Sequence, residues 1–88
     1  MFIAHVRVLL RPSILDPEGK AIQHALGDLG MEAIQEVRTG SFFSLRVEAD
    51  SPEAAEAVVL QACEKLLANP VTEDFTILAL VPEDGVHV

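Results

Sequence analysis

The chain has 88 residues, half of them hydrophobic, and a net charge of −8. This length predicts one small domain, and the high apolar content predicts that part of it lies in a subunit interface. The six scattered basic residues exclude nucleic acid and anionic membranes as partners, because binding phosphates takes clustered Lys and Arg. A single cysteine rules out an internal disulfide and suits a reducing, cytoplasmic setting.

The first half of the chain predicts a strand, a helix and a hairpin. Residues 2–11 alternate as in a strand, and residues 17–29 carry apolar side chains at helical spacing, with Gly30 suited to end the helix. Residues 33–39 and 42–49 predict a hairpin in which Gly40 supplies the turn.

The second half predicts a helix, a strand and a tail. Ser51-Pro52-Glu53 is typical of a helix start, and Asn69-Pro70 of its end. The predicted buried stripe of this helix is Ala55, Val58, Val59, Ala62 and Leu66. Residues 75–81 predict the last strand, and residues 82–88 a flexible or partner-docked tail. No apolar run approaches the roughly 20 residues of a transmembrane helix.

The order βαββαβ predicts an α+β fold, a ferredoxin-like antiparallel sheet with both helices on one face. The other face is then open. On the last strand both faces are apolar, and Leu9, Leu78 and Leu80 are expected on the open side. An open apolar sheet face in water predicts self-association, as a dimer or a dimer of dimers.

Sites of chemistry are few. The sequence has no phosphate-binding glycine loop and no metal-ligand spacing among His5, His24, Cys63 and His87. His24 and Asp28 are four residues apart on the predicted helix, which favours a surface ion pair over a ligand pair. Cys63 lies beside the apolar stripe of the second helix and is expected to be a buried hydrophobic residue.

The stretch SILDPEGKAIQHAL, residues 13–26, mixes carboxylates with a glutamine and a histidine. Asp16 and Pro17 are explained as a helix cap and first turn, and Glu18 adds charge that favours the helix dipole. Gly19 is not explained by capping, because glycine costs about 1 kcal/mol in a helix. We therefore expect close approach by another backbone or chain at Gly19.

The words LDPEGKAIQHAL, EVRTG and CEKLLANPVTEDF resemble the PurS family, the small subunit of formylglycinamidine ribonucleotide synthase in purine biosynthesis. They cover almost the whole chain, in order and with the family's spacing. Two positions depart from the pattern: Ser41 stands where the family has lysine, and Thr72 where it has isoleucine. The signature carried over by the resemblance comprises Asp16, Pro17, Gly19, Gln23, Arg38, Gly40, Leu67, Asn69, Pro70 and Glu73.

The resemblance implies a non-catalytic subunit that bridges a glutaminase subunit and a large synthetase subunit. The synthetase would bind ATP and magnesium, and this chain would carry no catalytic residue, cofactor or metal. Two other hypotheses remain at this stage. One is a small-molecule sensor that binds its ligand at the DPEG loop, and the other is a stand-alone enzyme that uses His24 with Asp16 or Glu18.

Overall fold

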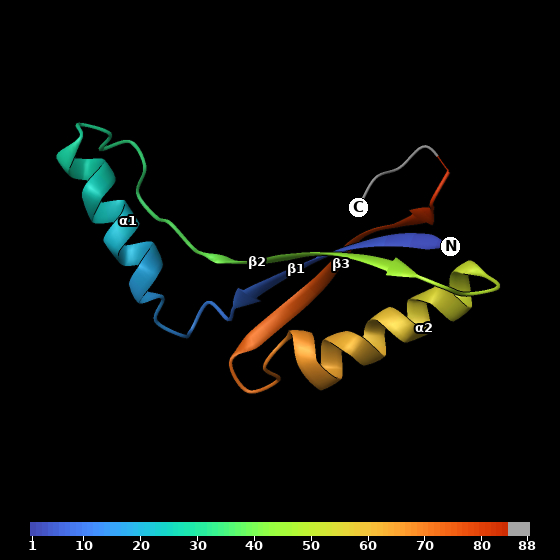
Figure 1. Ribbon diagram of the computed structural model, residues 1–88. Coiled ribbons are helices and arrows are strands. Elements are labelled where there is room, and N and C mark those ends of the chain that lie inside the picture. The colour runs from blue at the N-terminus through green and yellow to red at the C-terminus, as the bar shows by residue number, and fades with distance from the viewer. Residues whose placement is uncertain (85–88) are drawn as a thin grey trace.

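The computed structural model describes residues 1–84 and shows one antiparallel sheet with two helices (Figure 1). The elements in chain order are β1 (Phe2–Leu10), α1 (Pro17–Asp28), β2 (Gly40–Val47), α2 (Pro52–Ala62), η1 (Cys63–Leu67) and β3 (Glu73–Pro82). The stretch η1 is π-helical and continues α2 without a break.

The sheet has the order β2-β1-β3, so β1 is its central strand. β1 pairs with β2 from Phe2 opposite Val47 to Leu9 opposite Gly40. The pairing of β1 with β3 shifts after His5, so that Leu78 is an extra residue on β3. Such a bulge changes the face to which the following side chains point.

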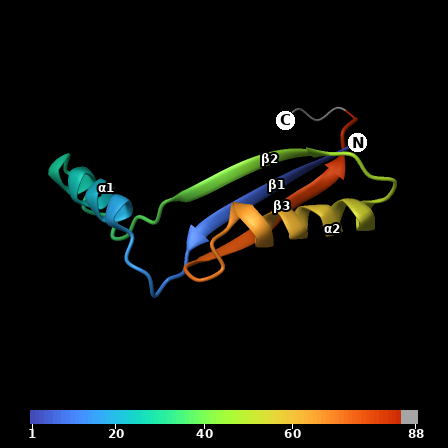
Figure 2. The ribbon, with the colours of Figure 1, turned by 60° about the horizontal axis from the view of Figure 1, so that its bottom comes forward.

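The core lies between one face of the sheet and α2, which runs along that face (Figure 2). As the alternation in β1 predicts, Ala4, Val6 and Val8 are buried on this face. They meet Val59 and Cys63, which are both fully buried. Cys63 is therefore part of the core, as the sequence predicts.

The helix boundaries follow local sequence signals. Asp16 caps α1, and Gly30 follows its end with a φ of 87°, a left-handed conformation that suits glycine. Ser51 caps α2 by accepting a hydrogen bond from the backbone N–H of Ala54, at 3.1 Å. The predicted burial of Val58 and Leu66 is wrong, since their exposed fractions are 49% and 83%. The wider π-helical turn places Leu67, not Leu66, against the core.

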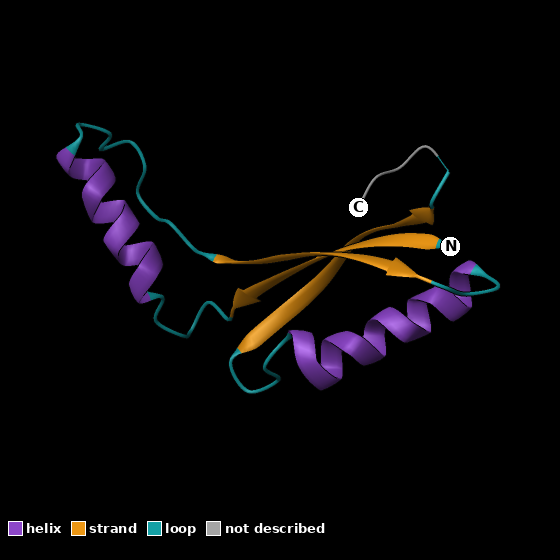
Figure 3. Ribbon diagram, viewed as in Figure 1, coloured by secondary structure: helices purple, strands orange, loops and turns teal. Residues whose placement is uncertain are grey.

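The α+β fold class and the antiparallel sheet are confirmed. The predicted hairpin and the predicted placement of both helices on one face of the sheet are wrong. Residues 33–39 form no strand here, and Gly40 begins β2 instead of turning a hairpin. The chain runs straight from residues 33–39 into β2, within the loop that Figure 3 shows between α1 and the sheet. As a result, α1 stands beyond the end of the sheet, and the sheet face carries α2 alone (Figures 1 and 2). We call residues 12–39 the arm.

The predicted tail begins within the sheet, since Pro82 is the last residue of β3. Glu83 donates its backbone N–H to the carbonyl oxygen of Met1 at 3.0 Å. Its carboxylate also accepts a hydrogen bond from Nε of Arg46 at 2.7 Å. Residues 85–88, the rest of the predicted tail, lie outside the described residues.

Candidate functional site

Asp16 is the centre of the first cluster of signature residues. Its exposed fraction is only 2%. The carboxylate accepts hydrogen bonds from the backbone N–H of Gly19 at 2.9 Å, from the backbone N–H of Thr39 at 2.6 Å and from the Thr39 hydroxyl at 2.9 Å. The bond from the Thr39 backbone, followed by that from Gly19, holds the pKa of Asp16 below its ordinary value. Asp16 is thus both a helix cap and a clamp between α1 and residues 35–39.

Gly19 allows this clamp to close. A Cβ atom at Gly19 would overlap the carbonyl oxygen of Val37 and would lie 2.9 Å from Oδ2 of Asp16. The expectation that another backbone approaches Gly19 is therefore confirmed, and that backbone belongs to the same chain. One helical turn later, Gln23 donates a hydrogen bond from Nε2 to the carbonyl oxygen of Gln35 at 2.7 Å.

Arg38 ties the arm to the end of β1. Its guanidinium donates to the carbonyl oxygens of Arg11 at 2.9 Å and Ile14 at 3.0 Å, with a longer contact to Leu10 at 3.4 Å. Leu10 is the last residue of β1, and Arg11 and Ile14 lie in the connection from β1 to α1. All three contacts come from Nη2, and Arg38 thus holds that connection against residues 35–39.

A second cluster forms the turn before β3. The Asn69 side chain accepts a hydrogen bond from the backbone N–H of Val71 at 3.0 Å, and the Glu73 carboxylate accepts one from the backbone N–H of Asn69 at 2.7 Å. Arg11 donates from Nη2 to the carbonyl oxygen of Pro70 at 2.6 Å and pairs with Asp74 at 3.2 Å. This turn therefore supports the end of the sheet.

The two clusters contain most of the predicted signature residues, and each has a contact that supports the fold. Pro17 occupies the first turn of α1 behind Asp16. Gly40 lies in β2, where a Cβ atom would overlap the carbonyl oxygen of Val8. Sequence reasoning missed Arg11 and the contact of Thr39 with Asp16. The contacts of Arg11 with Pro70 and Asp74, and of Thr39 with Asp16, join residues far apart in the sequence, so no local pattern indicates them.

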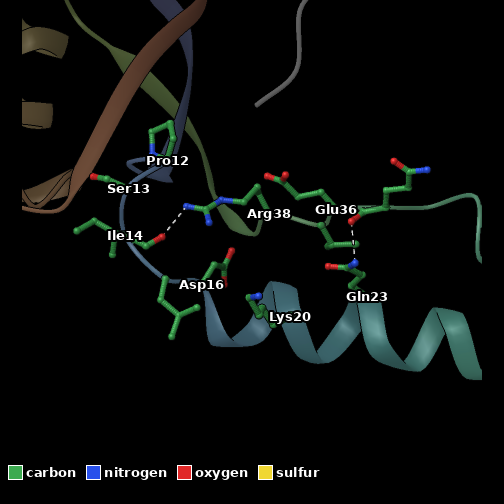
Figure 4. Close-up of a pocket in the computed structure, with 11 residues that line it drawn as sticks. Pro12, Ser13, Ile14, Asp16, Lys20, Gln23, Glu36 and Arg38 are labelled. Atoms are coloured by element: carbon green, nitrogen blue, oxygen red, sulfur yellow. Dashed lines mark hydrogen bonds between the residues drawn. The ribbon is translucent and has the colours of Figure 1, made fainter.

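A polar groove runs between α1 and residues 35–38, with a volume of about 500 Å³. In Figure 4, Arg38 reaches from one side of this groove toward Ile14, and Gln23 reaches from α1 toward residues 35–36. Lys20 and Glu36 also line it. The groove is the place where the sensor hypothesis puts a ligand, but its Asp16, Gln23 and Arg38 side chains already bind the chain itself.

Within residues 1–84, the candidate reactive side chains are not gathered into a catalytic site. His24 and Asp28 have exposed fractions of 85% and 74% and form a surface pair at 3.8 Å, the arrangement that the sequence favours. Burial raises the pKa of the Cys63 thiol, and the nearby charge of Glu64 raises it further, so Cys63 is a poor nucleophile. Across residues 1–84, no three side chains of His, Cys, Asp or Glu are grouped to hold a metal ion. No helix in that range is long and apolar enough to cross a membrane.

The three leucines expected on the open sheet face divide between two environments. Leu9 lies on the same side of β1 as Arg7, away from the core, and Leu78 is the bulge residue, with an exposed fraction of 48%. The prediction that Leu80 lies on the open face is wrong. Leu80 lies opposite Ala4 and packs against the core, because the bulge at Leu78 reverses the alternation that the sequence predicts.

A family model described as PurS, phosphoribosylformylglycinamidine (FGAM) synthase, matches residues 3–80 of this chain. The chain belongs to the PurS family. The PurS subunit of Bacillus subtilis FGAM synthase is 43% identical to this chain over 85% of it and 88% of the relative's own length. The subunit from Mycobacterium leprae is 47% identical over 84% of this chain and 90% of the relative.

Solved structures from the PurS family agree with the fold. The structure of Bacillus subtilis PurS covers 93% of this chain and 100% of its own, with a TM-score of 0.82 and 39% identity. A chain in the structure of PurLQS from Thermotoga maritima covers 88% of this chain and 95% of its own, with a TM-score of 0.80 and 32% identity.

Proposed function

We propose that this chain is the small, non-catalytic subunit of phosphoribosylformylglycinamidine synthase. That ligase uses ATP and glutamine to convert formylglycinamide ribonucleotide to formylglycinamidine ribonucleotide in purine biosynthesis. The observation that carries the proposal is the similarity to PurS subunits over nearly the whole chain. The likeness to a chain of PurLQS further supports work within a complex of several subunits.

In this proposal the chain joins a glutaminase subunit to a large synthetase subunit in the cytoplasm. ATP and magnesium bind to the synthetase, and the chain itself is a homodimer or a dimer of dimers. The polar signature residues of the chain support its fold and stay the proposed positions of partner contact, to which other side chains add. Large exposed apolar side chains are available for this purpose: Leu15, Phe42, Leu66 and Val71 have exposed fractions of 62%, 61%, 83% and 74%.

Reconstitution with the glutaminase and synthetase subunits of the same organism tests the proposal. Glutamine-dependent synthesis should rise with the amount of this chain and level off when it is stoichiometric with its partners. Ammonium chloride supplied in place of glutamine should reduce the dependence on the chain, because a bridging subunit serves the transfer of ammonia. The chain alone should show no turnover.

Two results would contradict the proposal. One is a glutamine-dependent rate that does not respond to the chain, together with failure of the three proteins to elute as one complex. The other is turnover by the purified chain alone that survives a second purification. The first result removes the assembly role, and the second removes the absence of catalysis.

A further inference from the structure

We propose that the cleft between η1 and the start of β3 is a docking site for a protein partner. Its occupant is a segment of a partner subunit that presents a large apolar side chain next to a lysine or arginine. This inference rests on the proposed function and names a surface through which the chain holds one of its two partner subunits.

The cleft lies at the end of the sheet, where the turn after α2 leads into β3 (Figures 1 and 3). Its volume is about 370 Å³. Of the residues that line it, Cys63 and Ala68 are buried and Phe75 is half-buried. Burial, followed by the charge of Glu64, holds the pKa of the Cys63 thiol above its ordinary value, so its sulfur carries no negative charge near neutral pH. The inner part of the cleft is therefore an uncharged surface that suits an apolar side chain.

Leu66 and Val71 extend the apolar surface of this turn. Each lies in the chain between residues that line the cleft, and their exposed fractions are 83% and 74%. The π-helical turn of η1 directs Leu66 outward, since it places Leu67 against the core. Turns of this kind are rare and often lie at functional sites. We call the cleft together with Leu66 and Val71 the end patch, and its exposed apolar side chains are typical of the centre of a protein interface.

The rim of the end patch is acidic. Three carboxylates line the cleft, those of Glu64, Glu73 and Asp74, and the one cation that lines it is Arg11. Arg11 pairs with Asp74, whereas Glu64 has no ion-pair partner among residues 1–84. The whole chain has a net charge of −8. Complementary charge selects partners and speeds their approach, so a lysine or arginine beside the apolar side chain fits this rim.

A small ligand and a second copy of this chain fit the end patch less well. Arg11 already donates to the carbonyl oxygen of Pro70, and the Glu73 carboxylate already accepts from the backbone N–H of Asn69. Few polar groups therefore remain to orient a small molecule. In a two-fold contact, a second copy would bring the same carboxylates to the rim, and like charges oppose such a contact. A partner subunit with a basic and apolar segment has neither difficulty.

Reconstituted glutamine-dependent synthesis tests docking through the apolar side chains. The quantity measured is the concentration of this chain that gives the half-maximal rate with the glutaminase and synthetase subunits of the same organism. Leu66→Gln keeps the length and helix propensity of the side chain and should raise this concentration about tenfold or more. Val71→Thr keeps the shape of the side chain and should raise it severalfold. Val58→Thr makes the same isosteric change at an exposed position of α2 outside the end patch and should leave it unchanged.

Charge reversal tests the acidic rim. Glu64→Lys should raise the half-maximal concentration about tenfold at low salt, and the difference from the native chain should shrink as sodium chloride is added. Glu56→Lys makes the same change at another exposed position of α2 and should have a much smaller effect. Circular dichroism and sedimentation equilibrium should show the native fold and mass for every variant. If Leu66→Gln does not fold, Val71→Thr and Glu64→Lys complete the test.

Photo-cross-linking identifies the occupant. Val71→Cys is labelled with benzophenone maleimide before the subunits are mixed, and Cys63 is buried and stays unlabelled in the folded chain. After irradiation, the label should be attached to a peptide of the glutaminase or the synthetase that contains a large apolar residue next to a lysine or arginine. Val58→Cys, labelled in the same way, is the control and should give little of this product.

The docking site is overturned if the variants at Leu66, Val71 and Glu64 fold and support synthesis at the native half-maximal concentration. It is also overturned if the label is attached only to a second copy of this chain, or if Leu66→Gln lowers the mass of the free chain, because the end patch then joins copies. A native chain that supports synthesis beside variants that behave like it removes the docking site and leaves the assembly role. A native chain that never supports synthesis removes the assembly role and the docking site with it.

Discussion

Gly19→Ala tests the clamp that holds α1 to residues 35–39. The new methyl group would overlap the carbonyl oxygen of Val37 and lie 2.9 Å from Oδ2 of Asp16. The methyl group has little room to turn away, since the overlapped atom is backbone and the carboxylate is held by hydrogen bonds. Either the segment carrying Val37 moves away from α1, or the hydrogen bonds between Thr39 and Asp16 lengthen.

Two effects of this substitution oppose each other. Alanine gains about 1 kcal/mol over glycine in a helix interior. Overpacking at a close contact costs about 1–3 kcal/mol, and strained or lost hydrogen bonds add about 1 kcal/mol for each bond. We expect a net loss of about 2 kcal/mol, which lowers the melting temperature of a domain this size by roughly 10 °C.

Gly27→Ala is the matched control. Gly27 lies in the same helix, and a Cβ atom there would meet nothing within 4 Å. This variant should gain about 0.5–1 kcal/mol from helix propensity. Urea and thermal unfolding are followed by circular dichroism at one protein concentration, because the stability of an oligomer depends on concentration. The two variants have the same composition, so equal stabilities would refute the reasoning about Val37.

Three further predictions concern other contacts. Because the pKa of Asp16 is lowered in the folded chain, its ionised form stabilises the fold above the ordinary pKa, and this contribution is lost as the pH falls through the lowered value. Between about pH 7 and pH 3, the urea midpoint should therefore fall less in Asp16→Asn than in the native chain, and equal falls would count against the clamp. Arg38→Ala should lower the free energy of unfolding by about 2 kcal/mol, because three carbonyl groups lose their donor. Arg46→Ala removes an exposed ion pair and should lower it by less than about 1 kcal/mol. Leu80 packs against the core and Leu78 is the bulge residue. In the same assay, Leu80→Ala should lower the free energy of unfolding by about 2 kcal/mol and Leu78→Ala by less than about 1 kcal/mol. The reverse order would show that the bulge is misplaced.

Local chemistry in the sequence determined where the helices begin and end. Asp16 before Pro17 and Ser51 before Pro52 place side-chain acceptors at free helix amides, and Gly30 takes the left-handed conformation after α1. These signals act over three or four residues, so no knowledge of the rest of the fold is needed. The alternation in β1 likewise identified the strand face that packs against α2.

The candidate site was only partly accessible from the sequence. The signature positions came from a resemblance, and Gly19 was singled out because glycine is costly in a helix. The partner of Gly19 is Val37, 18 positions later in the numbering, and the acceptors of Arg38 include Leu10 and Arg11. Nothing local to these residues indicates such contacts, because they depend on how the arm returns to the sheet.

Two of the wrong predictions concern places where a regular period is interrupted. One extra residue at Leu78 moves Leu80 from the open face into the core, and the π-helical turn at η1 exchanges the places of Leu66 and Leu67. A period read from sequence assumes an unbroken ladder, and only the tertiary structure shows the break.

The sequence by itself determined that residues 33–39 favour an extended conformation and that α1 needs a surface for its apolar face. It did not determine that the chain runs straight through Gly40 instead of turning back. Residues 33–39 are extended both in a closed hairpin and in the arm, so local propensity does not separate the two arrangements. The tertiary structure decided between them, because only there does the arm extend past the sheet and leave the edge of β2 without a strand in the described part of the chain.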